Sequence, residues 1–101
     1  MSRAIGNQAE VGVVAKTISA ATRTLLVADN NSRVGLTVRN NSTAVLTIFL
    51  GLAAGTEEGT VTIAPTATGV DSTWVCPVNY TGPVSGQWAS ANGFAYTTEF
   101  I

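Results

Sequence analysis

The amino-acid sequence predicts an all-β fold, an antiparallel β-sandwich or jelly-roll-like barrel of about eight short strands. Three observations lead to this prediction. Apolar residues alternate with polar ones in segment after segment, and no segment shows the recurrence of an amphipathic helix. β-branched residues, which suit a pleated sheet better than a helix, are dense along the chain. Turn sequences recur about every 8–12 residues, as they do in sandwiches and barrels.

The expected strands follow from the alternation and from the turn sequences that separate them. Turn sequences occupy 19–22, 29–32, 55–59, 65–69, 79–83 and 91–93. The strands are therefore expected, in order, at 11–18, 23–28, 34–39, 44–51, 60–64, 70–76, 84–90 and 94–100. Together they make residues 11–101 a single β-sandwich domain. Residues 1–10 lack alternation, so we expect them to form an extended N-terminal arm.

Two of these strands differ in how their faces are composed. In 34–38 the large apolar side chains fall on one face, whereas in 44–50 both faces are mostly apolar. Apolar side chains on both faces are typical of a strand that is buried on both sides. We therefore expect 44–51 to be a central strand, or one covered by a partner.

The tripeptide Asn-Asn-Ser occurs twice, at 30–32 and at 40–42, each time before an alternating segment. Asn tolerates the left-handed conformation, and its side chain can bond to the backbone two residues further on. Each copy is therefore predicted to be a turn that introduces a strand. The two strands would follow one another in a meander.

The end of the chain predicts a hairpin around Asn92 and Gly93. A two-residue turn would place Trp88 opposite Thr97. A three-residue loop with Gly93 in the left-handed region would place Trp88 opposite Tyr96 and gather the large side chains on one face. We favour the second register, because register is strongly set where one face is buried.

The composition points to a surface that lies against other protein. Charged residues make up 11% of the chain and the net charge is −1, so Thr, Ser and Asn must supply the surface polarity. No basic stripe of the kind that binds nucleic acid is present. The most apolar stretch, 44–54, is about half the length that crosses a bilayer, and the start lacks the apolar core of a secretion signal. The single cysteine, Cys76, is expected to face the core of a protein assembled in a reducing cytosol.

The chain offers little catalytic chemistry. It has no histidine, which excludes Ser-His-Asp and Cys-His systems and histidine metal sites. Glu57 and Glu58 are the only neighbouring acids, in a Gly-flanked loop. They could bind Ca²⁺ with loop carbonyls, but a solvated hairpin loop is the favoured interpretation. We expect no catalytic site, no metal and no cofactor.

Four side chains are ambiguous between structure and binding. Arg33 and Arg39 flank one strand and either pair with carboxylates of a neighbouring subunit or lie solvated at an edge, the second being favoured. Trp74 and Trp88 either belong to the core or a subunit interface, which is favoured, or stand in an exposed aromatic row that binds sugar rings.

Two segments resemble a group of small bacteriophage structural proteins. They are RVGLTVRNNSTAVLTIFLG at 33–51 and NYTGPVSGQWASANGFAYTTEF at 79–100. The group carries an R-x-G-L-x-[IV]-x-N-N-S-T-A strand pair. It ends in Y-T-G-x-V-S-G-x-W-x-x-A-N-G-x-A-x-x-T-E. The resemblance fades before residue 30.

The resemblance implies a virion component, assembled in the host cytoplasm, that decorates the capsid as a cement protein. Its partner would be the major capsid protein, and it would form a homo-oligomer, with a trimer favoured. Residues expected to contact partners are Arg3, Ile5, Arg33, Arg39 and Trp74. A neck, tail or fibre position is an alternative. Another is a carbohydrate-binding adhesion module, which predicts Trp74, Tyr80, Trp88 or Tyr96 lined up on an accessible surface.

Overall fold

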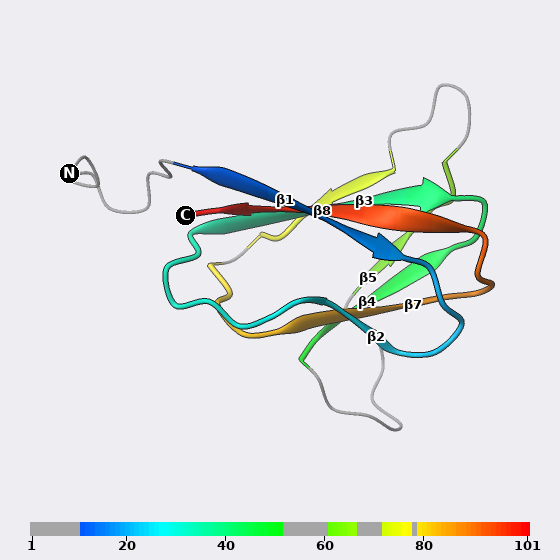
Figure 1. Cartoon of the computed structure of the whole chain (residues 1–101), viewed down its shortest axis with the longest axis horizontal. Helices are drawn as coiled ribbons and strands as arrows, with labels where there is room; N and C mark the ends of the chain where they lie inside the picture. Colours follow the sequence, from blue (N-terminus) through cyan, green and yellow to red (C-terminus); the bar gives the residue numbers. More distant parts are fainter. Residues whose placement is uncertain (1–10, 52–60, 67–71, 78) are drawn as a thin grey trace.

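A computed structural model describes residues 11–51, 61–66, 72–77 and 79–101 (Figure 1). Eight strands and no helix occur in these segments, and the strands pack as two layers. The strands are β1 (Gly12–Ile18), β2 (Thr24–Val27), β3 (Gly35–Ser42), β4 (Leu46–Leu50), β5 (Val61–Ile63), β6 (Thr73–Val75), β7 (Val84–Trp88) and β8 (Gly93–Phe100). The predicted all-β fold is confirmed. The expected arm, residues 1–10, lies outside the described residues.

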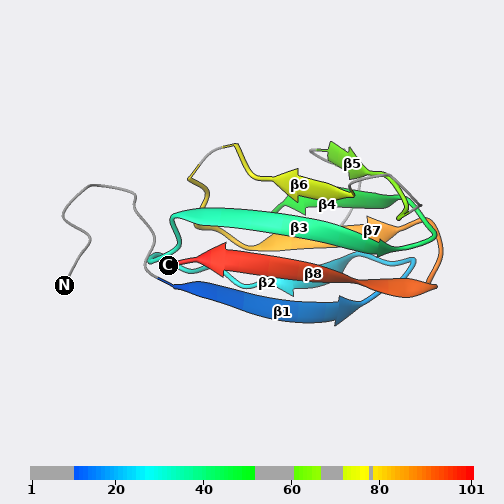
Figure 2. The same ribbon diagram turned by 90° about the horizontal axis from the view of Figure 1, so that it is seen from above.

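The strand order is that of a jelly roll. One sheet, called sheet A, has the order β1-β8-β3-β6, and the other, sheet B, has the order β2-β7-β4-β5. All pairs are antiparallel. The pairs β1–β8, β2–β7, β3–β6 and β4–β5 correspond to one long hairpin that is folded across two sheets. Figure 2 shows sheet A from above, with β1 at one edge and β6 at the other.

The predicted strands agree with the observed ones in number, order and approximate position. The segment expected at 44–51 is β4, which lies between β7 and β5, so its predicted central position is confirmed. The bounds differ most at the start of β6, which begins at Thr73, and at the end of β3, which runs to Ser42 and so includes the second Asn-Asn-Ser copy.

The predicted meander between the two Asn-Asn-Ser strands is wrong, because β3 lies in sheet A and β4 in sheet B. The first copy does make the expected turn, in which the Ser32 N–H donates to Asn30 Oδ1 at 3.0 Å. The second copy, at 40–42, is strand, not turn. Identical tripeptides differ here because the sheet partner β8 pairs the second copy along its whole length.

The predicted hairpin between the last two strands is also wrong in both registers. β7 and β8 lie in different sheets, and the chain crosses from one sheet to the other at Asn92. Trp88 is opposite Leu46 of β4, whereas Tyr96 is opposite Lys16 and Arg39. Gly93 is not in the left-handed region; among the described residues only Gly51 has a positive φ, of 143°.

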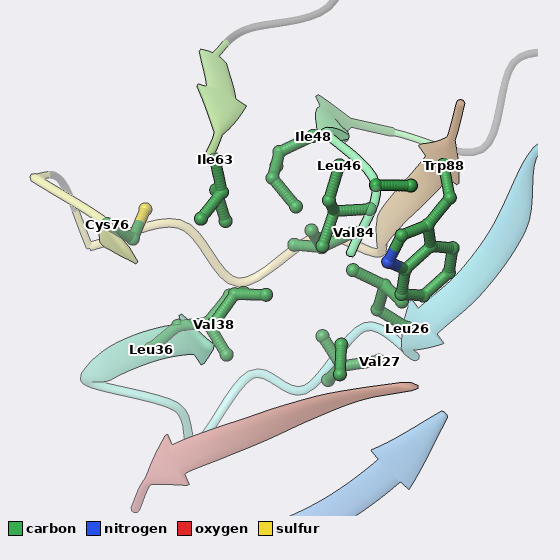
Figure 3. Close-up of a cluster of buried hydrophobic side chains, with 12 residues drawn as sticks. Leu26, Val27, Leu36, Val38, Leu46, Ile48, Ile63, Cys76, Val84 and Trp88 are labelled. Atoms are coloured by element: carbon green, nitrogen blue, oxygen red, sulfur yellow. The ribbon is translucent and has the colours of Figure 1, made fainter. Parts of the chain in front are cut away.

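The core lies between the sheets and is built from their facing sides (Figure 3). Trp88 is its largest member and is 1% exposed. Cys76 is buried here, as predicted. The buried apolar cluster comprises Leu26, Val27, Leu36, Val38, Ala44, Leu46, Ile48, Ile63, Cys76, Val84, Trp88 and Ala95.

A buried polar side chain, that of Asn40, joins the two sheets inside this core. Asn40 belongs to β3 and is 0% exposed. Its Nδ2 lies 2.8 Å from the Ala44 carbonyl oxygen and 3.2 Å from that of Ile63, both on the sheet B side. Its Oδ1 accepts from Trp88 Nε1 at 3.1 Å and from Ser42 Oγ at 2.8 Å. The amide is thus satisfied on both ends, as a buried polar group requires.

The start of β8 approaches the end of β3 so closely that only glycine fits at position 93. A Cβ placed on Gly93 would lie 2.5 Å from Ser42 Cβ and 2.6 Å from the Asn41 carbonyl oxygen. The Gly93 carbonyl also accepts from the Ser19 N–H at 3.0 Å, and the Gly93 N–H donates to Ser19 Oγ at 2.9 Å. Gly93 therefore holds the ends of β1, β8 and β3 together.

Replacing Gly93→Ala is expected to lower the free energy of unfolding by about 2 kcal/mol, because the added methyl group meets backbone atoms that cannot move aside. Gly12→Ala is the control, since its Cβ would lie at an ordinary 3.6 Å from the Phe100 ring. Urea denaturation of both variants measures the effect. Equal stability of the two would contradict this account.

Replacing Asn40→Ala is expected to lower the free energy of unfolding by about 3 kcal/mol, because it removes the acceptor of the buried Trp88 N–H and the amide that donates to the Ile63 carbonyl. The neighbouring Asn41 faces the other side of sheet A, so Asn41→Ala should change stability by less than about 0.5 kcal/mol. Thermal and urea unfolding followed by Trp fluorescence compares the two. A small loss for Asn40→Ala would show that this network contributes little.

Candidate interaction surface

The outer side of sheet A, which faces away from the core, carries a group of exposed and half-buried apolar side chains. Residues opposite one another in a sheet project to the same side, and alternate residues share that side. The registers of β1, β8, β3 and β6 therefore place these side chains together. We call this group the apolar face; it consists of Val14, Ile18, Val75, Phe94, Tyr96 and Phe100.

Aromatic rings and a lysine are packed against one another in the middle of the apolar face. The Phe94 and Tyr96 rings meet edge to face, with centroids 5.1 Å apart. The Lys16 ammonium lies over the Phe94 ring, 4.3 Å from its centroid. Such contacts hold exposed side chains in fixed positions without hiding them.

In the described segments, the charged side chains on this side of sheet A are both positive. Lys16 and Arg39 lie in the same row across the sheet, on either side of Tyr96. Of the acids in the described segments, Asp29 is in a loop and Glu99 projects to the inner side beside Leu36. The apolar face thus presents aromatic and aliphatic groups with two cations, which suits a protein surface that is apolar with acidic groups.

The outer side of sheet B is different. Its aromatic residue, Phe49, is buried, with the Arg23 guanidinium 3.6 Å from the ring centroid. Thr47, Thr62 and Gln87 project on the same side, where Leu25 is the exposed apolar residue of the strands; Val45, directly before β4, is exposed as well. The contrast marks sheet A as the side suited to a protein partner.

Arg33 does not lie at a solvated edge, so the favoured interpretation of this residue is wrong. It is 1% exposed, and its Nε donates to Glu99 Oε2 at 2.8 Å. The remaining guanidinium donors reach the carbonyl oxygens of Tyr80 at 3.0 Å, Gly82 at 2.9 Å and Ala28 at 2.5 Å. The guanidinium is therefore used inside the chain, where it ties two loops to β8, and we do not retain Arg33 as a partner-binding residue.

The other residues predicted to contact partners differ in where they lie. Arg39 is exposed on the outer side of sheet A, where it remains a candidate. Trp74 is half-buried and packs against the core from the inner side. Arg3 and Ile5 lie outside the described residues, as do Glu57 and Glu58. The sequence reasoning missed the apolar face, although the alternation in 11–18 and 94–100 placed its members on one side of each strand.

The aromatic residues named for sugar binding do not share one accessible side. Trp88 is buried, and Trp74 and Tyr80 pack against the core. The Tyr80 hydroxyl donates to the Pro83 carbonyl at 3.0 Å. Only Tyr96 of the four lies on the outer side of sheet A. The aromatic row that this alternative predicts is therefore not formed by these residues.

The described surface shows neither a pocket nor a group of His, Cys, Asp and Glu that could hold a metal. Within the same segments no helix is long and apolar enough to cross a membrane. The fold and the apolar face together define a small jelly-roll domain with one side suited to protein contact. Comparison with protein-family models, with curated proteins and with solved structures found no match.

Replacing Arg33→Met is expected to lower the free energy of unfolding by about 3 kcal/mol, because it leaves the Glu99 carboxylate and three carbonyls without their donor. Arg39→Met is the control, because Arg39 is exposed and should change stability by less than about 0.5 kcal/mol. Chemical denaturation at two salt concentrations measures both. Equal losses for the two arginines would refute the assignment.

Proposed function

We propose that the chain is a structural protein of a bacteriophage virion that attaches to the outer capsid surface and stabilises the junctions between capsid subunits. It acts without catalysis, as a homo-oligomer, and its partner is the major capsid protein. The apolar face of sheet A supplies the contact, together with Lys16 and Arg39. The observation that carries the proposal is that six exposed or half-buried apolar side chains gather on this face, whereas the strands of sheet B carry one exposed apolar residue, Leu25, on their outer side.

Apolar side chains that are exposed to water cost free energy, which is recovered when a partner covers them. Val14, Ile18 and Val75 are exposed on the same side of one sheet, where they form no hydrogen bonds with water. Val14 and Ile18 lie beside β8, and Val75 lies on the far side of Thr98 and Thr37 in the same row as Val14. Exposed apolar side chains gathered on one side of a small domain are typical of an interaction site. Tyr96, which packs edge to face against Phe94, is of a residue type that is enriched among those contributing most of the energy at protein interfaces.

Three further features support a virion role. Jelly rolls are common in viral capsid domains, although the same fold also occurs in lectins and enzymes. Only 11% of the residues are charged, which suits a surface that stays covered. The motifs at 33–51 and 79–100 resemble those of small phage structural proteins. A capsid repeats its binding sites, so an oligomer that contacts several of them converts weak single contacts into firm attachment.

Adding the purified protein to capsids that lack it, followed by cryo-electron microscopy, tests the proposal. We expect new density on the outer surface at subunit junctions. The variant Tyr96→Glu places a carboxylate in the middle of the apolar face and should reduce occupancy about tenfold, because a charge in an apolar contact is costly.

Leu25→Glu is the matched control. It changes an exposed apolar residue on the outer side of sheet B, which the proposal does not use, and occupancy should be unchanged. Capsids that gain no density with the wild-type protein would overturn the decoration role. Equal loss with the two variants would overturn the assignment of the apolar face.

A further inference from the structure

Strand β1 is an open edge of sheet A (Figure 2). The Val11 and Ile101 backbones exchange both hydrogen bonds, at 2.9 and 2.8 Å, and the Ser19 N–H donates to the Gly93 carbonyl at 3.0 Å. In an antiparallel ladder, residue pairs that exchange backbone hydrogen bonds alternate with pairs that do not. The odd-numbered residues of β1 are therefore the ones that bond to β8. The N–H and C=O groups of Gly12, Val14, Lys16 and Ile18 therefore point away from the sheet, and no described strand lies on that side.

β1 carries one charged residue, Lys16, but it lacks the short length, the following proline and the register shift that protect the other edges. It is 7 residues long, its register with β8 is unbroken, and it contains no proline. The edge strands β5 and β6 are 3 residues each and are followed within two residues by Pro65 and Pro77. The edge strand β2 has a register shift between Leu25 and Val27. A long, regular and apolar edge is a site where another strand adds.

Both sides of β1 are exposed as well as its edge. Val14 and Ile18 project to the outer side, and Val13 projects to the inner side, where it too is exposed. A strand added at this edge would cover apolar side chains on both sides of the sheet at once. Main-chain bonds would supply the pairing and these side chains the burial.

We propose that β1 pairs with β1 of a second copy of this chain, antiparallel, about a two-fold axis at Ala15. Ala15 is the middle residue of Gly12–Ile18, so this register pairs all seven residues. Each residue whose N–H and C=O groups point away from β8 then lies opposite another such residue of the second copy: Gly12 lies opposite Ile18, and Val14 lies opposite Lys16. Four such pairs supply about eight backbone hydrogen bonds.

The side chains agree with this register. The two Ala15 residues meet at the axis in a non-bonded pair, where backbones lie closest and small side chains fit. On the same side, Val13 lies opposite Thr17. The charge of Lys16 is directed over the Phe94 ring of its own chain, away from the edge, and lies opposite Val14 rather than opposite the second Lys16. No like charges face each other, and the strand is complementary to itself, as a two-fold interface requires.

The pairing extends sheet A into a continuous sheet of both copies, with the two apolar faces side by side on one surface. This dimer goes beyond the proposed function and does not rest on it, because only the edge and its side chains carry the argument. A trimer, the state that the resemblance favours, needs a different contact.

Light scattering on the wild-type full chain and on two proline variants tests the proposal. Val14→Pro removes an outward N–H of β1 without removing a bond to β8. Val75→Pro does the same at the opposite edge of sheet A, where the Cys76 N–H, and not that of Val75, bonds to β3. The two valines are matched, since each is 63% exposed.

We expect a wild-type dimer, a dimer of Val75→Pro, and a dissociation constant raised about 100-fold or more in Val14→Pro, with circular dichroism unchanged. Wild-type protein that is monomeric or trimeric would overturn the proposal. So would dissociation of Val75→Pro while Val14→Pro remains a dimer.

A second measurement does not depend on the proline variant folding. Ala15→Cys places two thiols opposite each other at the axis, within reach of a disulfide. Val13→Cys is the control, because Val13 lies opposite Thr17 and not opposite itself. Mild oxidation should cross-link Ala15→Cys at least about tenfold more than Val13→Cys on a non-reducing gel. Equal cross-linking, or none in either variant, would overturn the two-fold register.

Discussion

The two sheets of this sandwich are held in one relative position by the buried amide of Asn40. Apolar packing alone allows sheets to slide, because contacts between aliphatic groups have little directional preference. The Asn40 amide donates to the carbonyl of Ile63 in β5 and to that of Ala44, which precedes β4, and it accepts from the Trp88 indole of β7, while its backbone belongs to β3 in sheet A. Satisfying both ends of this amide requires β3, β5 and β7 to hold fixed positions relative to one another. The apolar face and the edge of β1 lie on the sheet whose position this amide fixes.

Alternation along the chain predicted where strands begin and end, because it reflects which side of a strand is buried. It could not predict which strand pairs with which. The Asn-Asn-Ser tripeptides show the limit: Asn30 makes a turn and Asn40 lies in a strand, and only the presence of β8 beside the second distinguishes them. Trp88 was expected opposite Tyr96 because the two are close in sequence, but the order of a jelly roll separates them into different sheets. The burial of Arg33 could not be predicted from the sequence either, because its partner Glu99 lies 66 residues away along the chain.

The residues that carry the resemblance to phage structural proteins are largely internal here. Arg33 and Glu99 form an ion pair, and Asn40, Ser42 and Trp88 form one polar network. Gly93 is required by close backbone contact. Most of the apolar face, by contrast, lies outside the motif positions. The motif residues therefore hold the sandwich together, whereas the contact that we propose for the apolar face depends on surface side chains that no motif position specifies.

The pairing of β1 with β8 has a consequence for how the chain folds. β8 lies between β1 and β3, so sheet A has no continuous interior until Phe94–Phe100 have left the ribosome. Until then β1 has no neighbour in the sheet, and contacts between such distant segments form slowly. A partly synthesised chain would expose apolar strands and be prone to aggregate. Chaperone binding to the chain before β8 has been synthesised should therefore affect the yield of this domain.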